Sequence, residues 1–464
     1  MPNLYQLLSE QLMQYIRILT LTLSVFATMA LGSPLHGASP TLPHAAGVLA
    51  STLADGDTLW NEVAGFVDKF PRRLSGSQAL EDGINWLLKR LRADGWRVNR
   101  QNVHVPVWVR GTEWCKLVEG GPAHAMPMAG LGGSVSTGGK PLRAPVLVVS
   151  SFADLEQKAH RAKGKIVVWN VPFSTYGATV EYRYSGASKA AAVGAVASLV
   201  RSVGPFGMQT PHTGMMEYDD TFPKIPCAAI TIEDALLLQR LQDAEQVPVV
   251  ELYMEARELP DAVSGNIVFE IPGTDLANEV VVMGGHIDSW DLGTGAMDDA
   301  SGCFVAWRAL HAIRRAGLKP RRTLRVCFWT NEENGLRGAR AYAEHTRHEK
   351  HFAAMEIDGG TFNPTGFSGS VPTYMRTNIL EILGLLKPVG ATTWAEGGGG
   401  ADTSPLAEKG VPVLELTVDT TKYFWYHHTE ADTPDKLDPQ ELNKCTYAVA
   451  VMAYALSCMD SQQE

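Results

Sequence analysis

The stretch Val280-Val-Val-Met-Gly-Gly-His286-Ile-Asp288 sets the framework for interpreting the rest of this chain. Its opening run of apolar residues predicts a strand, and a histidine and an aspartate follow where that strand should end. In open α/β sheets, ligands collect beyond the carboxyl ends of the strands. The stretch therefore predicts a functional site at one rim of a sheet.

The segment from residue 266 onward alternates between patterns typical of strands and patterns typical of helices. We expect strands at 280–283, 323–330, 352–357 and 411–418, and helices at 301–316, 335–349, 378–386 and 439–458. Such alternation favours strands joined by helices that cover both faces of the sheet. The fold class that follows is α/β, with a mixed, mostly parallel central sheet flanked by helices.

The region before this segment has two parts. Residues 77–95 predict an amphipathic helix, because apolar side chains recur at positions i, i+3, i+4 and i+7, and residues 96–108 alternate as a strand does. From residue 120 the sequence pattern changes to clustered glycines and prolines, short strand-like runs and an alanine-rich helix. This stretch has no clustered metal ligands. We interpret residues 120–258 as a small α/β domain inserted into the main one.

The overall composition is that of a folded, water-soluble protein, with 464 residues, 45% of them hydrophobic and 19% charged. This length suggests two domains, or one enlarged domain with an insertion. The formal net charge of −10, with no long basic run, argues against a nucleic acid partner. The six cysteines lack the close pairing of a structural zinc site, so we interpret most of them as small core residues.

The N-terminus carries an apolar run at residues 18–31, which follows Arg17 and precedes small residues. This is the pattern of a secretory signal peptide, with cleavage expected after Gly32. The run is short for a membrane span, and a retained anchor or a buried helix is the alternative. We expect a secreted or periplasmic protein with no membrane attachment after signal cleavage.

Further polar side chains lie at the ends of the other expected strands. Glu332 and Glu333 follow one strand, and Asp358 follows another. Asp298 in Met-Asp-Asp-Ala-Ser-Gly and His428 in His-His-Thr-Glu-Ala-Asp complete the set. Each short motif alone is weak, but carboxylates and imidazoles gathered at one rim suit zinc. Two such ions a few Å apart can activate a water and polarise a carbonyl together.

Longer motifs follow the pattern of one known family. They are Gly285-His-Ile-Asp-Ser-Trp-Asp-Leu-Gly-Thr-Gly-Ala-Met-Asp-Asp-Ala-Ser-Gly302, Lys163-Gly-Lys-Ile-Val-Val-Trp, Tyr423-Phe-Trp-Tyr-His-His and Arg73-Leu-Ser-Gly-Ser. On these motifs the chain resembles the co-catalytic di-zinc exopeptidases over almost all of its length after the signal. The resemblance implies a signal peptide at 1–32, a catalytic domain at 33–119 and 259–464, and a protease-associated-like insertion at 120–258.

The resemblance also implies a ligand set for two Zn²⁺ ions. Asp298 would bridge the two ions. His286 and Asp358 would complete one site, and Glu333 and His428 would complete the other.

Three further residues are expected to take part in catalysis. Glu332 resembles the general base that takes a proton from a metal-bridging water. Asp288 resembles the carboxylate that orients the imidazole of His286. Some relatives place a tyrosine just before the last histidine ligand; here that position is His427, our candidate donor to the oxyanion. The family further implies a cis peptide bond after the bridging aspartate and a glycine-rich pocket segment at 397–405.

The function implied is hydrolysis of dipeptides or short peptides with free termini, through a metal-bridging hydroxide and a glutamate general base. A peptide is then the expected substrate, and a homodimer is expected because relatives dimerise. Two alternatives are a zinc-dependent glutaminyl cyclase on the same scaffold, which uses a single zinc, and a non-catalytic binding homologue that has lost its ligands. The complete ligand set favours hydrolysis. Cleavage from the amino end, cleavage from the carboxyl end and splitting of dipeptides alone are all compatible with these residues.

Overall fold

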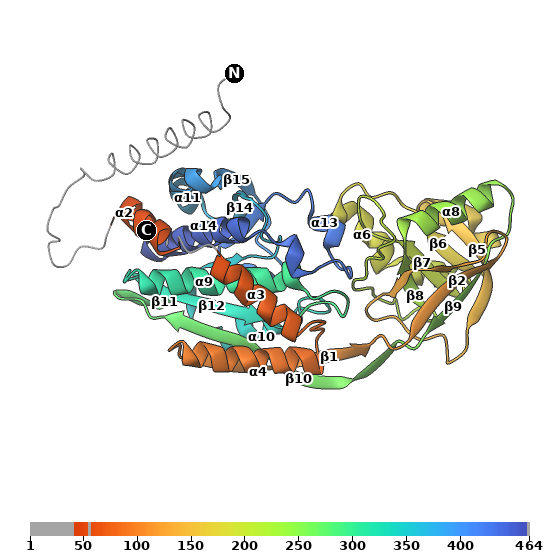
Figure 1. Cartoon of the computed structure of the whole chain (residues 1–464), viewed down its shortest axis with the longest axis horizontal. Helices are drawn as coiled ribbons and strands as arrows, with labels where there is room; N and C mark the ends of the chain where they lie inside the picture. The colour runs from red at the N-terminus through yellow and green to blue at the C-terminus, as the bar shows by residue number, and fades with distance from the viewer. Residues whose placement is uncertain (1–40, 54–56, 462–464) are drawn as a thin grey trace, which may run out of the picture. The chain divides into compact units, whose positions relative to one another are not determined.

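Residues 41–53 and 57–461, which the structure describes, form two eight-stranded sheets in this computed structural model (Figure 1). The expected signal peptide, 1–32, lies outside the described residues and stays a prediction. None of the helices in the described part of the chain is long and apolar enough to cross a membrane.

The first sheet is mixed, and its centre is parallel. Strand β11 pairs in parallel with β12 on one side and with β13 on the other, and β13 pairs in parallel with β16. The sheet order is β1 (Val98–Val109), β10 (Arg257–Ile271), β12 (Arg322–Trp329), β11 (Leu276–His286), β13 (Lys350–Glu356), β16 (Val413–Val418), β14 (Pro364–Ser370) and β15 (Thr393–Glu396). The predicted α/β class with a mixed central sheet is confirmed.

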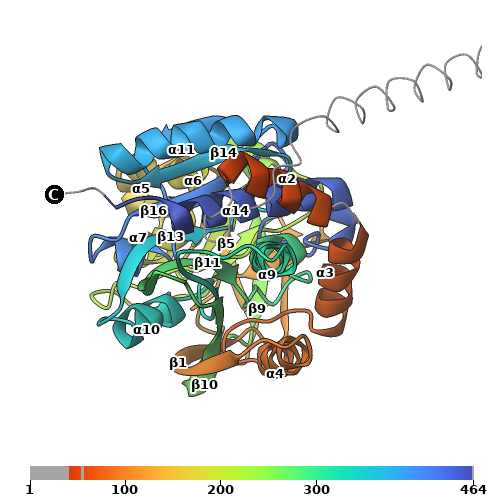
Figure 2. The same cartoon turned by 90° about the vertical axis from the view of Figure 1, so that its left-hand side faces the viewer.

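Helices cover both faces of this sheet (Figure 2). Along β11, Val281 and Met283 pack into the buried cluster that includes α9 and α14, whereas Val280 and Val282 pack on the opposite face with α10. Side chains of successive strand residues point to opposite faces, so a strand buried on both faces is apolar throughout. The covering helices are α9 (Ser301–Arg315), α14 (Pro439–Cys458) and α10 (Arg337–His345), with α2 (Leu42–Thr52), α3 (Asp57–Lys69), α4 (Gln78–Ala93) and α11 (Thr373–Leu385) joining the cluster on the α9 side.

The second sheet is built from residues between β1 and β10. Its strands are β3 (His124–Met126), β2 (Glu113–Glu119), β9 (Val249–Met254), β5 (Leu142–Val149), β6 (Ile166–Trp169), β7 (Ala197–Arg201), β8 (Cys227–Ile230) and β4 (Met128–Gly130), with helices α5 (Phe152–Lys158), α6 (Tyr176–Tyr184), α7 (Gly186–Ala192) and α8 (Ile232–Asp243). Strands β1 and β10 pair antiparallel from Val98 opposite Phe269 to Val109 opposite Arg257. The chain therefore passes to and from the second sheet along one paired ribbon.

One helix is shorter than the sequence pattern predicts. The expected helix at 335–349 begins only at Arg337, in α10. Asn331 and Leu336 both have positive φ values, 67° and 62°, so the backbone between β12 and α10 forms a tight left-handed turn instead of an early helical turn. This turn holds the two glutamates of the candidate site.

The six cysteines are all free. Five are buried, and Cys458 is partly exposed. The interpretation of most of them as small core residues is confirmed.

Candidate metal centre

Three of the five candidate ligands come from neighbouring strand ends. His286 is the last residue of β11, Glu333 follows the end of β12, and Asp358 follows the end of β13. Because β11 pairs in parallel with both other strands, their carboxyl ends lie side by side. The predicted rim site is therefore present in the fold.

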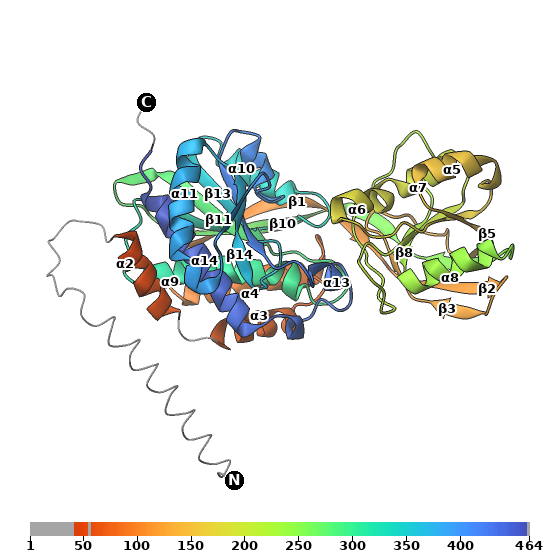
Figure 3. The ribbon, with the colours of Figure 1, turned by 90° about the horizontal axis from the view of Figure 1, so that it is seen from above.

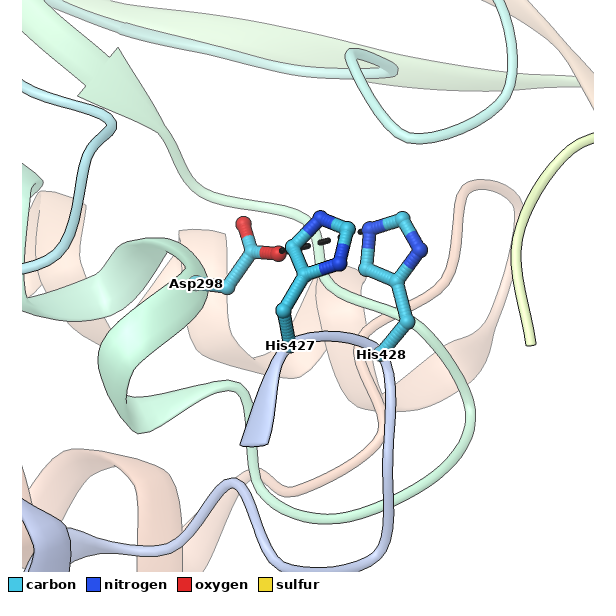
Figure 4. Close-up of side chains that lie close together, drawn as sticks. All are labelled: Asp298, His427 and His428. Carbon is cyan, nitrogen blue, oxygen red and sulfur yellow. Dashed lines mark ion pairs between the residues drawn. The ribbon is translucent and has the colours of Figure 1, made fainter. Parts of the chain in front are cut away.

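Asp298 lies between two histidines that are far apart in the sequence. Its Oδ1 lies 3.1 Å from His286 Nε2, and its Oδ2 lies 3.4 Å from His428 Nε2. Figure 4 shows the carboxylate of Asp298 facing the imidazoles of His427 and His428. One carboxylate thus presents one oxygen to each of two imidazoles.

Each of these histidines also contacts a carboxylate of its own. Asp358 Oδ1 lies 3.3 Å from His286 Nε2, and Glu333 Oε2 lies 3.1 Å from His428 Nε2. The arrangement is two groups of nitrogen and oxygen atoms that share Asp298. Close groups of potential ligand atoms in the described residues include His286, Asp298 and Glu333, then His286, Asp299 and Asp358, and also Asp298, His427 and His428.

Backbone carbonyls fix the protonation of both imidazoles. His286 Nδ1 lies 3.0 Å from the carbonyl oxygen of Asp288, and His428 Nδ1 lies 3.3 Å from that of Thr213. A carbonyl only accepts, so each Nδ1 donates its proton, and each Nε2, which faces the carboxylates, is the nitrogen that can bind a metal. Such support by a backbone carbonyl is typical of metal-binding histidines.

The carboxylate of Asp288 contacts a backbone turn, whereas it was expected to orient the imidazole of His286. It accepts hydrogen bonds from the backbone N–H groups of Glu332 (3.2 Å) and Glu333 (3.3 Å), and from the Ser75 hydroxyl (3.4 Å). His286 Nδ1 is 3.8 Å from this carboxylate, further than from the Asp288 carbonyl. The backbone of Asp288 therefore orients the imidazole, while its side chain fixes the turn that carries both glutamates.

Asp432 is a residue of the site to which the sequence analysis gave no role. Its carboxylate accepts hydrogen bonds from the backbone N–H groups of Ala296 (3.0 Å), Met297 (2.7 Å) and Asp298 (3.2 Å). It thereby holds the loop that carries Asp298. Its position at the end of His-His-Thr-Glu-Ala-Asp, close to a candidate ligand, was the available signal.

Asp299 supports the same loop from the other side. It accepts from the backbone N–H groups of His286 and Gly302, each at 3.1 Å, so it ties the end of β11 to the start of α9. The peptide bond between Asp298 and Asp299 is cis, as expected.

The crowding of these acids changes their pKa values. Burial raises the pKa of Glu332 to about 8, with Asp358 and Asp298 raising it further against the effect of His286. Burial also raises the pKa of Asp432 to about 7. Asp358 Oδ1 is buried and accepts no hydrogen bond. So many buried carboxylates gathered around imidazole nitrogens form a donor set that fits divalent zinc.

A cleft of about 720 Å³ opens over this centre. One wall carries Glu332, Asp358 and His427, and the other carries residues from the part of the chain between β1 and β10, among them Tyr176 and Arg183. In Figures 1 and 3, α6 lies beside α13 (Tyr423–Tyr426), which His427 follows directly. The candidate site is therefore completed by residues of helix α6, which lies in the part of the chain between β1 and β10.

The glycine-rich segment 397–405, which was expected to line the pocket, lies behind the cleft wall: a Cβ at Gly398 would lie 3.3 Å from Oε2 of Glu415, which lines the cleft. The segment also packs against a buried acid. A Cβ at Gly400 would lie 2.2 Å from Glu356 Oε2, and that same oxygen accepts a hydrogen bond from Thr403 N at 2.9 Å. The glycines allow the backbone to approach the side chain of Glu356 closely.

His427 lies within the site, as the sequence predicted. Its ring stacks on His428 at 3.6 Å between centroids and contacts the edge of Tyr176 at 5.1 Å. Its Nε2 is 3.7 Å from Asp298 Oδ2. Burial, together with His428, lowers the pKa of His427 well below its ordinary value, so the imidazole is neutral at neutral pH and carries a single N–H.

Comparison with known proteins identifies the family of the chain. Residues 266–453 match the family described as Peptidase family M28. Carboxypeptidase Q of Xenopus laevis is 43% identical over 406 residues, which cover 86% of each chain.

Two solved structures share the fold. The crystal structure of a Peptidase M28 precursor from Shewanella amazonensis SB2B has a TM-score of 0.87 at 30% identity and covers 91% of this chain and 98% of that one. A zinc aminopeptidase from Bacillus subtilis has a TM-score of 0.62 at 18% identity, with 89% and 96% covered, and shows the common fold alone. The chain belongs to peptidase family M28, as a carboxypeptidase Q-like member.

Proposed function

We propose that this chain is a zinc metallo-exopeptidase that holds two zinc ions and hydrolyses dipeptides or short peptides with free termini. The observation that carries this proposal is the position of Asp298 between His286 and His428, with one carboxylate oxygen facing each imidazole. A peptidase of family M28 with one zinc site would need only one of these groups. The second group favours hydrolysis with two ions over a glutaminyl cyclase with one.

The ligands divide into two sets that share Asp298. His286 and Asp358 would hold one ion, and Glu333 and His428 would hold the other. When bound, two zinc ions supply Lewis acidity that polarises the substrate carbonyl and lowers the pKa of an attacking water toward neutrality. The complete sets also argue against a non-catalytic binding homologue.

Glu332 is the proposed general base. Its side chain lines the cleft, and its backbone N–H is held by Asp288, so the carboxylate projects from a fixed turn. It takes the proton of the attacking water and passes it to the leaving amine. Asp288 acts as a positioning residue for this turn.

His427 is the proposed donor to the oxyanion. It lines the cleft beside His428, and its neutral imidazole has one N–H to offer. A donor held in place by stacking loses little freedom when charge develops on the substrate oxygen.

We also propose a domain organisation and a destination for the chain. Residues 120–258 would form a protease-associated-like domain inserted between the two parts of the catalytic domain, 33–119 and 259–464. The segment 1–32 would act as a signal peptide that sends the enzyme to the periplasm or outside the cell. The mature enzyme would form a homodimer, which its mass in solution by light scattering tests.

The function is tested by measuring bound zinc and product formation on the same sample. We expect two zinc ions per chain, cleavage of dipeptides, and loss of cleavage after chelation with recovery on adding zinc. Ring closure of a glutaminyl peptide without dipeptide cleavage would support the cyclase instead. Absence of zinc and of both activities would support a binding homologue.

A further inference from the structure

Arg183 is a buried cation in the wall of the cleft. It lies in α6 of the inserted segment, and only 5% of its surface is exposed. Among the described residues that line the cleft, it is the sole arginine, and no lysine is present. The opposite wall is acidic, with Glu332, Asp358 and Glu415. The cleft therefore has a single fixed positive side chain, on the side away from the strand ends.

The hydrogen bonds of Arg183 go only to neutral acceptors. Nε donates to the carbonyl of Met215 and Nη1 to the carbonyl of Thr213, both at 3.3 Å, and Nη2 donates to the Tyr176 hydroxyl at 2.9 Å. These bonds use three of the five N–H groups of a guanidinium, which leaves one on each Nη. A guanidinium with one unused N–H on each Nη can donate both to a single carboxylate.

No carboxylate of the described residues forms an ion pair with Arg183. The nearby acid on the inserted side, Glu217, is hydrogen-bonded to the Tyr184 hydroxyl instead. A buried cation without an anion is costly, because it has lost its water and gained no opposite charge. An anionic group brought by the substrate would supply the missing charge.

One backbone carbonyl connects the guanidinium to a histidine of the candidate metal centre. The carbonyl oxygen of Thr213 accepts from Arg183 Nη1 and from His428 Nδ1, each at 3.3 Å. An extended residue spans about 3.5 Å, and a charge-assisted hydrogen bond adds about 2.8 Å. A carboxylate one residue beyond a carbonyl at the metal centre can therefore reach Arg183.

We propose that Arg183 binds the free α-carboxylate of the substrate, one residue beyond the scissile bond. This inference rests on the proposed peptidase function and deepens it, because it selects among the modes of cleavage. The enzyme then removes a C-terminal residue that carries a free carboxylate, and a dipeptide is its smallest substrate. Arg183 is the residue that determines this specificity.

Two neighbours position the guanidinium. Tyr176 lies two helical turns before Arg183 on the same face of α6, and its ring stacks on Phe424 at 5.1 Å while its hydroxyl accepts from Nη2. On the other side, a Cβ at Gly214 would lie 2.3 Å from Arg183 Cζ, so the guanidinium packs directly on that backbone. The orientation of the fork is thus set before substrate arrives.

The test compares a panel of dipeptides with the same dipeptides as C-terminal amides, on the full-length zinc-loaded enzyme. We expect the native enzyme to prefer the free acids, and Arg183→Met to lower kcat/KM on the acids about 10–100-fold, chiefly through KM. Activity on the amides should stay within about 2-fold, because the amide offers no charge to Arg183. Arg183→Lys should recover part of the loss on the acids, because it restores the charge without the fork.

Arg201→Met is the matched control. Arg201 lies in the same inserted segment and bonds to Asn170, but it is not part of the cleft wall. It should leave the acid-to-amide ratio unchanged. Zinc content and the thermal unfolding midpoint of each variant separate a folding defect from a specificity defect.

The results on the two enzymes test the role of Arg183 and the proposed function separately. An equal fall on acids and amides in Arg183→Met, with zinc retained, would overturn the assignment of Arg183. If that variant fails to fold, the native enzyme alone decides, because equal cleavage of acids and amides contradicts a carboxylate site. If the native enzyme cleaves neither form, the proposed function itself fails.

Discussion

Asp432 Oδ2 accepts a hydrogen bond from the backbone N–H of Asp298 at 3.2 Å, although the two residues are 134 positions apart. The other oxygen of the same carboxylate accepts from Ala296 and Met297. A single buried side chain thus holds the loop from which Asp298 reaches both histidines. The geometry of the metal centre depends on this support as well as on the ligands themselves.

Replacing Asp432 with asparagine should weaken zinc binding about 10–100-fold, the range seen when the partners that orient metal ligands are removed. The amide would present N–H groups to backbone N–H groups, so the loop would lose its fixed position. Competition with a chromophoric chelator measures the affinity. Asp435→Asn is the matched control, because Asp435 lies in the same region with a side chain that is 69% exposed. Equal affinities in both variants would contradict the supporting role.

Replacing Glu332 with glutamine should retain both zinc ions and lower kcat about 10²–10⁴-fold, because the amide can no longer accept a proton. Metal analysis and steady-state hydrolysis of a dipeptide measure the two effects together. Glu344→Gln, on an exposed side chain of α10, should behave like the native enzyme. A fully active Glu332→Gln variant would refute the assignment of the general base.

Replacing Asp298 with alanine should remove zinc as well as activity, because both ligand sets lose their shared oxygen donor. Asp358→Ala should have a narrower effect and weaken the His286 site more than the His428 site. Zinc counted per chain after dialysis distinguishes the two variants. If Asp298→Ala kept two ions, Asp298 would not be the shared ligand.

The metal-free protein should lose stability as the pH rises from about 5 to about 8. Glu332 and Asp432 have folded-state pKa values raised to about 8 and about 7, above their ordinary values. Between the ordinary pKa and the raised folded pKa of such a group, the folded chain keeps a proton that the unfolded chain has released, so each rise in pH favours unfolding. Bound zinc opposes the effect, because it compensates the charge of the ionised carboxylates. In the presence of chelator, the thermal unfolding midpoint should therefore fall over this pH range. The midpoint of the zinc-loaded protein should fall by less over the same range. A midpoint that rises with pH in chelator would contradict the prediction.

The sequence predicts the parts of this molecule that follow from local pattern. The apolar run at Val280 marks a buried strand, and parallel pairing then brings His286 and Asp358 to one rim regardless of their separation in the chain. Asp298 is not at a strand end, and it was predicted from the motif around it. The central sheet and the closing helix at 439–458 were therefore predictable.

The remaining features depend on contacts that local pattern does not encode. Thr213 contacts His428 through its backbone carbonyl, which any residue possesses, so no residue type signals it. Arg183 resembles any other arginine on an amphipathic helix until the fold places it against Thr213 and Tyr176. From the sequence, the side chain of Asp288 could have faced either the His286 imidazole or the turn that carries Glu332. In the structure Asn331 is left-handed, and the backbone N–H of Glu332 donates to the Asp288 carboxylate.

The most direct test of the account is the position and number of zinc ions in a crystal of the full-length enzyme, located by anomalous scattering at the zinc edge. The account predicts two ions, one beside His286 and Asp358 and one beside Glu333 and His428, each bonded to a different oxygen of Asp298. A single ion, or two ions of which one does not touch Asp298, would contradict it.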